Sequence, residues 1–171
     1  MKYDLSFVTS FPDSEAFRRL MVQYFSVMVP MLEGVGGPTL SADAMAQDAL
    51  DHAEEMFPTN GRLLLATDEN GALCGSGVIR KIRPDAAELK KMFVRPAMQG
   101  DGLGRRLFEM RIEEARKMGC RTLYADTVRG NQAMLAMYEK FGFSYIDRYE
   151  ENANPEEYAP FLVFLEHQLS D

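Results

Sequence analysis

The chain has 171 residues, enough for one domain to bury a core without disulfides or metals. Its formal net charge of −7 argues against nucleic acid as the main partner, because binding to a phosphate backbone needs a basic face. No run approaches the roughly 18 apolar residues that span a membrane, and the start lacks the basic-then-apolar layout of a signal peptide. We expect a single domain over residues 1–171, with no nucleic-acid or membrane partner.

The few cysteines and histidines limit the chemistry further. Cys74 and Cys120 are the only cysteines, and they do not form a C-x-x-C pair. Two separate thiols are typical of a reducing compartment, which favours a cytoplasmic location. With only His52 and His167, a histidine-rich metal site is not expected.

The first third of the chain predicts one strand and two helices. Residues 5–9 alternate weakly and predict a strand. Ser14 is a candidate N-cap for an amphipathic helix that ends near residue 32, because apolar residues then recur at helical spacing. Ser41 or Asp43 is a candidate cap for a second helix that ends near residue 57.

The middle of the chain predicts three successive strands joined by tight turns. Residues 61–66 and 72–83 form an expected hairpin around the turn at 68–71. Pro84 then turns the chain into a third strand, residues 88–94. Strands that follow one another this closely pair antiparallel.

The last part alternates helices and strands. Helices are expected at residues 102–118, where Gly119 fits the C′ stop position, and at 131–141. Further strands are expected at residues 122–126, 143–149 and 161–166. The unit from 88 to 126 should be a right-handed parallel crossover. A mixed sheet with helices on both faces follows.

A glycine-rich loop lies where the strand at 88–94 leads into the helix at 102–118. Gly100, Gly102 and Gly104 let backbone N–H groups approach an anion, and the first N–H groups of the helix have no intrahelical acceptor. Arg95 and Arg105 lie beside this loop. The local sequence therefore predicts a phosphate site in an acidic chain.

Two familiar phosphate loops fit poorly. The G-x-x-x-x-G-K-[ST] run of P-loop proteins does not occur. In the dinucleotide fingerprint G-x-G-x-x-G, the third glycine position holds Arg105. Asp126 does end the next predicted strand, where a ribose-binding acid would lie, so a dinucleotide-binding oxidoreductase stays open as an alternative. The preceding hairpin, however, does not suit a doubly wound parallel sheet.

The spacing of Gln99, Gly102 and Gly104 resembles the Q/R-x-x-G-x-G/A pyrophosphate loop of the GNAT superfamily of N-acetyltransferases. The strand before the loop is similar to the family's fourth strand. After the loop, Asn131 and the run from Tyr138 to Phe143 resemble a second family signature. The resemblance is tight from residue 61 to 143 and looser at both ends, and it is greatest to bacterial-type enzymes that act on small molecules.

The resemblance implies an α/β GNAT fold. Its central sheet is mixed and mostly antiparallel, has helices on both faces, and contains a splayed strand pair that forms the acyl-CoA cleft. The implied activity is acetyl-CoA-dependent transfer of an acetyl group, without a metal, to a primary amine of a small-molecule or amino-acid-like acceptor. A non-catalytic acyl-CoA-binding or sensing module is the alternative. Dimers are common in similar proteins, so a homodimer is an expectation, although the sequence does not decide the oligomeric state.

The resemblance also implies which residues contact acetyl-CoA. The backbone of one strand would pair with the pantetheine arm like an added strand, and the glycine-rich loop would hold the pyrophosphate. Asn131 would contact the pantetheine or diphosphate region, although it could equally cap its helix. The implied contacts of the strand and loop are Met92, Phe93, Val94, Gln99, Gly100, Asp101, Gly102, Leu103, Gly104 and Arg105.

Acetyl transfer to an amine needs a base and an acid. A primary alkyl amine has a pKa of about 10.4 and is protonated at neutral pH, so a carboxylate or water chain must remove a proton. Glu88 is the first candidate base and Asp126 the second; Glu88 could instead form a surface ion pair with Lys90 or Arg83. Tyr138 is the candidate acid for the leaving thiolate, unless it only packs on the sheet. The acidic stretch at 150–157 is expected to be a solvated loop, or to attract a cationic amine.

Overall fold

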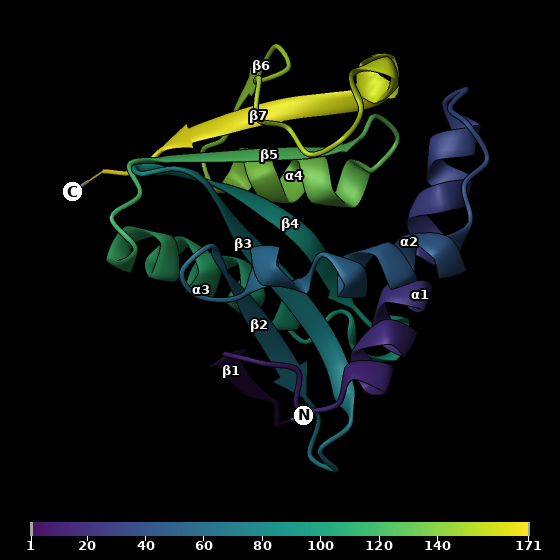
Figure 1. Ribbon diagram of the computed structural model, residues 1–171, viewed down its shortest axis with the longest axis vertical. Coiled ribbons are helices and arrows are strands. Elements are labelled where there is room, and N and C mark those ends of the chain that lie inside the picture. Colours follow the sequence, from purple (N-terminus) through teal and green to yellow (C-terminus); the bar gives the residue numbers. More distant parts are fainter. Residues whose placement is uncertain (1, 171) are drawn as a thin grey trace.

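The computed structural model describes residues 2–170 and contains a mixed sheet with helices on both faces (Figure 1). In this part of the chain the sheet has seven strands in the order β1-β2-β3-β4-β5-β7-β6. All neighbouring strands pair antiparallel except β4 and β5. The strands are β1 (Asp4–Val8), β2 (Gly61–Thr67), β3 (Leu73–Arg83), β4 (Ala86–Val94), β5 (Thr122–Val128), β6 (Ser144–Ile146) and β7 (Leu162–Gln168).

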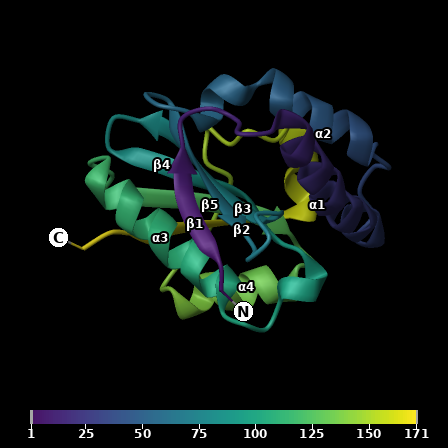
Figure 2. The ribbon, with the colours of Figure 1, turned by 90° about the horizontal axis from the view of Figure 1, so that it is seen from below.

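The helices divide between the two faces of the sheet (Figure 2). One face packs against the first helix pair and the other against the second pair, so each face has its own apolar core. Within residues 2–170, no helix combines the length and apolar character needed to cross a membrane. The helices are α1 (Ser14–Gly34) and α2 (Ala42–Asp51) on one face, α3 (Leu103–Lys117) and α4 (Gln132–Lys140) on the other, and the 3₁₀ turns η1 (Ala53–Met56), η2 (Pro96–Met98) and η3 (Glu156–Phe161).

The predicted order of elements is confirmed, with differences at the ends of helices. The N-cap of α1 is Asp13, whose Oδ1 accepts a hydrogen bond from the Ala16 N–H at 2.9 Å, so the expectation of Ser14 was wrong by one residue. Ser41 caps α2, as one of the two candidates. This helix ends at Asp51, earlier than expected, and the chain continues as the 3₁₀ turn η1.

The strand expected at residues 143–149 is much shorter than its pattern suggested. Only Ser144–Ile146 pairs, with the outer side of β7. The chain then leaves the sheet and forms a loop at residues 147–155. The guanidinium of Arg148 fastens this loop by donating to the backbone oxygens of Asn152 and Asn154, at 3.4 and 3.1 Å. This loop, called below the 147–155 loop, supplies polar groups to the site.

The only parallel strand pair in the described chain separates after a few residues. β4 and β5 pair from Ala86 with Thr122 to Leu89 with Ala125, and the pairing stops there. Beyond Leu89, the edge of β4 that faces β5 has no strand partner within residues 2–170. The expected splayed pair is therefore present.

A β-bulge in β4 accompanies this separation. One residue of β3 lies between Ser76 and Val78, whereas two residues of β4, Lys91 and Met92, lie opposite it. Lys91 adopts φ +50° at this bulge. The Ser76 hydroxyl donates to the Lys91 carbonyl at 3.0 Å. On the other face, the buried Arg111 guanidinium donates to the carbonyls of Val78 and Lys90 at 3.3 and 3.4 Å. Bulges redirect side chains and bend strands, so these contacts hold β4 in the diverging shape.

Candidate active site

The glycine-rich loop presents an open helix N-terminus. Gly100 and Gly102 have φ +96° and +81°, the left-handed region that side chains disfavour. Gly102 is the N-cap of α3 and makes no side-chain cap bond. The first N–H groups of this 15-residue helix therefore lack a side-chain acceptor and can face an anion at the positive end of the helix dipole. A Cβ at Gly104 would lie 3.5 Å from Met92 Cε, so the helix start packs closely against β4.

The side chains of the loop mostly contact the protein itself. The Gln99 amide donates to the Val94 carbonyl at 3.0 Å, and the Asp101 carboxylate accepts from the Tyr3 hydroxyl at 3.1 Å. Arg105, expected to reach the pyrophosphate, forms an exposed ion pair with Glu109 at 2.7 Å. The anion-binding capacity of the loop therefore resides in its backbone, and the side chain of Leu103 lies in the apolar core.

The strand edge and the second signature lie near this loop. Met92, Phe93 and Val94 belong to the part of β4 that pairs with β3 on one side and, in the described chain, has no strand partner on the side facing β5. Asn131 caps α4, because its Oδ1 accepts from the Met134 N–H at 3.3 Å. Its amide also donates to the Thr127 hydroxyl at 2.9 Å. Both polar ends of Asn131 thus have protein partners, which agrees with the capping interpretation.

Glu88 lies on β4 and is completely buried, with 0% exposure. Its Oε1 accepts from Arg80 Nε at 3.2 Å and faces Lys90 Nζ at 3.8 Å. Its Oε2 accepts from the Tyr149 hydroxyl at 2.5 Å. An ion pair of Glu88 with Lys90 is present, but Glu88 is buried, so the expectation that the pair lies on the surface was wrong. Arg83 instead pairs with Glu151 at 3.0 Å.

Asn152 of the 147–155 loop joins Glu88 to a second carboxylate, Asp126 on β5. Its amide donates to Asp126 Oδ2 at 2.7 Å and lies 3.4 Å from Glu88 Oε2. Asn154 donates to the other oxygen of Asp126 at 3.0 Å. The two acids come from the two splayed strands, so the loop spans the opening between them.

The pKa of Asp126 is raised toward neutrality. Burial, and next the negative charge of Glu88, raise the pKa of Asp126 to about 6. The amides of Asn152 and Asn154 and the charge of Lys90 oppose the shift only in part. A half-buried carboxylate that titrates near neutrality suits general-base chemistry.

Two phenols lie near the carboxylates from opposite faces of the sheet. Tyr138 on α4 is 3% exposed and packs edge-on against Phe108, with ring centroids 5.5 Å apart. Tyr24 on α1 packs near Phe93 at 6.0 Å. Burial raises the pKa of both phenols, and the charge of Asp126 raises them further. Both are therefore neutral proton donors at physiological pH.

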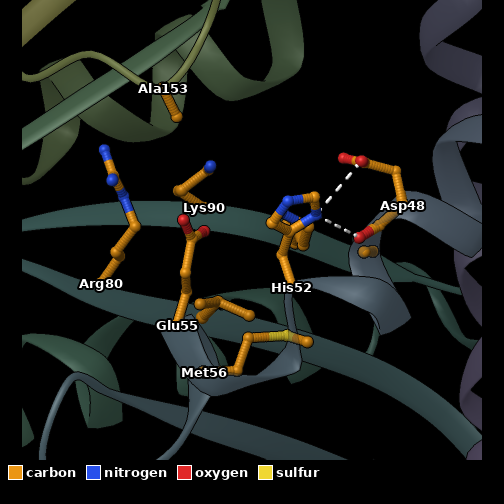
Figure 3. Close-up of a pocket in the computed structure, with 10 residues that line it drawn as sticks. Asp48, His52, Glu55, Met56, Arg80, Lys90 and Ala153 are labelled. Carbon is orange, nitrogen blue, oxygen red and sulfur yellow. Dashed lines mark hydrogen bonds and ion pairs between the residues drawn. The ribbon is translucent and has the colours of Figure 1, made fainter.

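A cavity of about 190 Å³ opens between α2 with η1 and the strands β3 and β4 (Figure 3), and two of its lining residues, Arg80 and Lys90, contact Glu88. We call it the strand-side cavity. In Figure 3, Arg80 and Lys90 point the same way from neighbouring strands, toward Ala153 of the 147–155 loop. Charged side chains dominate its wall: Asp48, His52, Glu55, Arg80, Lys90 and Lys91.

Several of these residues were missed by the sequence analysis. Tyr24 was expected on the apolar face of its helix and at the start of a segment that shapes the acceptor side, but no role of its own was predicted for it. Asn152 and Asn154 lie in a stretch expected to be solvated. Nothing in the local sequence distinguishes Asn152 and Asn154 from other polar loop residues, because their partner Asp126 lies 26 and 28 residues away on β5.

Comparison with known proteins decides between the remaining families. The acetyltransferase (GNAT) family model matches residues 30–143, which is most of the chain. The chain belongs to the GNAT superfamily of N-acetyltransferases. The mixed sheet with its antiparallel hairpins also excludes the doubly wound sheet that a dinucleotide-binding oxidoreductase of that type would need.

Individual GNAT relatives agree along most of the chain. The uncharacterized N-acetyltransferase YjgM of Escherichia coli K12 is 31% identical over 143 residues, covering 80% of this chain and 86% of that protein. An acetyltransferase structure from Streptococcus agalactiae matches with a TM-score of 0.74 at 23% identity, over 96% of this chain and 98% of the other. YncA of Salmonella typhimurium, whose structure is with its cofactor acetyl-CoA, matches with a TM-score of 0.61 at 19% identity, over 98% and 95%. These structures show that the GNAT fold is shared.

Proposed function

We propose that this GNAT acetyltransferase moves the acetyl group of acetyl-CoA directly to a primary amine of a small molecule, with both substrates bound together. The observation that supports this most is the raised pKa of Asp126, a half-buried acid on β5 just beyond the point where the pairing of β4 and β5 stops, together with the buried, uncharged phenol of Tyr138. One group can accept a proton and the other can donate one, as acyl transfer from a thioester to an amine requires.

Acetyl-CoA fits the residues of the donor side. The uncapped start of α3 can hold the pyrophosphate through backbone N–H groups, and the free edge of β4 from Met92 to Val94 can pair with the pantetheine arm. A backbone N–H near Phe93 can stabilise the negative charge that develops on the carbonyl oxygen. The acetyl-CoA found with YncA supports the same assignment.

We assign the role of base to Asp126 and not to Glu88, the first candidate from the sequence. The Glu88 carboxylate is enclosed by Arg80, Tyr149 and Asn152, so it has no direct approach to an acceptor. Its charge instead helps to raise the pKa of Asp126. Glu88 is thus a positioning residue that acts through Asp126.

The protons balance as follows in this mechanism. A protonated amine loses one proton before its nitrogen attacks the thioester carbonyl, and loses a second as the amide forms. Asp126 accepts the proton released at the attacking nitrogen. When the carbon–sulfur bond breaks, Tyr138 donates a proton to the leaving sulfur, and solvent then restores the phenol and takes the proton from Asp126. The net reaction gives the amide, CoA thiol and one free proton.

Acetyl-CoA should stabilise the folded protein. At a ligand concentration 100 times Kd, linkage predicts about 2.7 kcal/mol, equivalent to roughly 5–10 °C in Tm for a domain of this size. Differential scanning fluorimetry with acetyl-CoA, and with NADH as the control, measures this. A shift with NADH but none with acetyl-CoA would contradict the proposed donor.

Tyr138→Phe should lower kcat by about 10- to 100-fold while leaving the Kd of acetyl-CoA within twofold, because only the proton donor is lost. The hydroxyl makes no hydrogen bond in the described part of the chain, so the variant should fold normally. Steady-state kinetics and isothermal titration separate the two effects. Tyr145→Phe, at an exposed tyrosine, is the matched control. Unchanged turnover in Tyr138→Phe would remove Tyr138 from the mechanism.

A small acceptor agrees with the size of the strand-side cavity, about 190 Å³. In the acidic stretch, Glu151 pairs with Arg83 and its carbonyl accepts from Arg80 at 2.7 Å, whereas Glu150, Glu156 and Glu157 are exposed, so attraction of a cationic amine stays a prediction. The cytoplasmic location and the formation of a homodimer stay predictions from the sequence.

A further inference from the structure

The bulge in β4 places two consecutive lysines in one cavity. In a regular strand, successive side chains point to opposite faces of the sheet. Lys90 and Lys91 nevertheless both line the strand-side cavity, because Lys91 adopts φ +50° at the bulge. A residue other than glycine in this conformation is costly and persists where surrounding contacts enforce it, often at functional sites. Here Ser76 and Arg111 hold the bulge through the Lys91 and Lys90 carbonyls.

One cation of this cavity has no ion-pair partner in the described chain, although the carboxylates of Asp48 and Glu55 also line the wall. Arg80 and Lys90 share one oxygen of Glu88, at 3.2 and 3.8 Å. Asp48 is engaged by His52 at 3.2 Å. Lys91 has no carboxylate within 4.0 Å among residues 2–170.

The electrostatic state of Lys91 agrees with this count. Burial, and next the positive charge of Lys90, lower the pKa of Lys91 to about 7, while the more distant charges of Glu55 and Glu88 oppose the shift only in part. An anion beside Lys91 would offset both causes of the shift. The surroundings of Lys91 are therefore better suited to an anionic group than to a cation.

We propose that the strand-side cavity binds an anionic group of the acceptor, so that the acceptor is an amine bearing a carboxylate or a similar acid. Lys91 supplies the main contact, and Lys90 and Arg80 contribute. This inference rests on the proposed function, since it takes the cavity as the acceptor side of the same site.

The position of the cavity relative to Asp126 fits an acceptor with two ends. Ala153 lines the cavity, and the adjacent Asn152 donates to Asp126 at 2.7 Å. Lys90 lies in the cavity wall and is close enough to Asp126 for its charge to affect the pKa of that acid. An acid group held at Lys91 thus leaves the amine end directed toward Asp126, as an amino-acid-like molecule would require.

Binding of reaction products tests this without turnover. In the presence of CoA, isothermal titration would compare N-acetylglycine, N-acetylaspartate and N-acetylglutamate with the corresponding uncharged amides. At least one acid should bind tenfold or more tightly than its amide, the size expected for a charge-assisted contact. Equal binding of acids and amides, or no binding of any acid, would overturn the inference.

Two variants assign the effect to Lys91. Lys91→Gly removes the ammonium at a conformation that glycine adopts without strain, so the fold is retained, and the preference for acids should fall at least fivefold. Lys91→Arg should restore part of it. Lys117→Met, at an exposed lysine on α3, is the control and should leave the preference unchanged. An undiminished preference in Lys91→Gly contradicts the assignment.

Kinetics then separates the two proposals. With the free amines and acetyl-CoA, kcat/KM should be at least tenfold higher for an amino acid than for its amide. Transfer to amides as fast as to acids would overturn the anionic acceptor and leave the proposed function intact. Acids that bind as predicted while no amine consumes acetyl-CoA would sink the proposed function and leave the binding site standing.

Discussion

Replacing Asp126 by asparagine is expected to lower kcat by about two to three orders of magnitude, the usual contribution of a general base. The Kd of acetyl-CoA should stay within a factor of about two, because the groups proposed to bind the donor lie on α3 and the edge of β4. Stopped reactions that monitor CoA thiol release, together with titration of acetyl-CoA, measure both quantities. Asparagine keeps the size of the side chain and removes its charge and proton affinity, and its single oxygen can accept from only one of Asn152 and Asn154.

The dependence of kcat/KM on pH tests the role of Asp126 as the base more directly. Since the pKa of Asp126 is about 6, kcat/KM of the wild type should rise with pH below that value and lose this limb in Asp126→Asn. The groups that set this pKa are Glu88 and Lys90 on β4 and the two amides of the 147–155 loop. Asp147→Asn, at an exposed aspartate, is the control and should keep both the rate and the limb. An Asp126→Asn enzyme with wild-type rates would show that another group removes the proton.

The same pKa has a consequence for stability. The folded-state pKa of Asp126 lies above its unfolded value of 3.8, so the folded protein binds more protons between these two values. The contribution of Asp126 to stability is therefore fully present below 3.8 and is lost as pH rises to about 6. Ionised Asp126 is thus maintained at a cost to folding, as expected of a group kept for chemistry.

Replacing Gly102 by valine should weaken acetyl-CoA binding by about 100-fold or more. The residue has φ +81°, which a β-branched side chain adopts only with strain. It also has open space where its side chain would project, so the new methyl groups would occupy the approach of the pyrophosphate to the helix start. Titration with acetyl-CoA and with CoA measures the loss.

Gly119→Val is the matched control for that experiment. Gly119 has φ +82° and equally open surroundings, but it follows the opposite end of α3. Both variants should lose similar stability from backbone strain, of order 1–3 kcal/mol, and only Gly102→Val should lose cofactor affinity. Equal loss of affinity in both would mean that strain, and not obstruction of the phosphate site, is responsible.

The order of elements was predictable because it depends on neighbouring residues. The apolar runs in β2 and β3, the turn between them and the glycine that ends α3 all act within a few positions along the chain. The ends of elements were less predictable. The strand expected at 143–149 stops at Ile146, and Tyr149 turns inward and donates to Glu88. The apolar spacing of that segment did not reveal this long-range contact.

The donor side and the acceptor side of the site also differ in how far they could be predicted from the sequence. Its donor side consists of contiguous residues, from Met92 to Arg105, whose backbone conformation follows from glycines and a helix start. Its acceptor side is assembled from separate segments. Tyr149 lies 61 residues from its partner Glu88, and Asn152 lies 26 residues from Asp126. Which acid titrates near neutrality depends on these contacts and on burial.

By itself, the sequence determined the family, the phosphate loop and the strand that borders it, because local backbone geometry follows from residues that are adjacent in the chain. Only the tertiary structure decided that Glu88 is enclosed, that Asp126 can accept a proton, and that Lys91 faces the same cavity as Lys90. These properties arise from long-range packing and desolvation, since a carboxylate's pKa and a lysine's direction depend on the groups that folding brings around them.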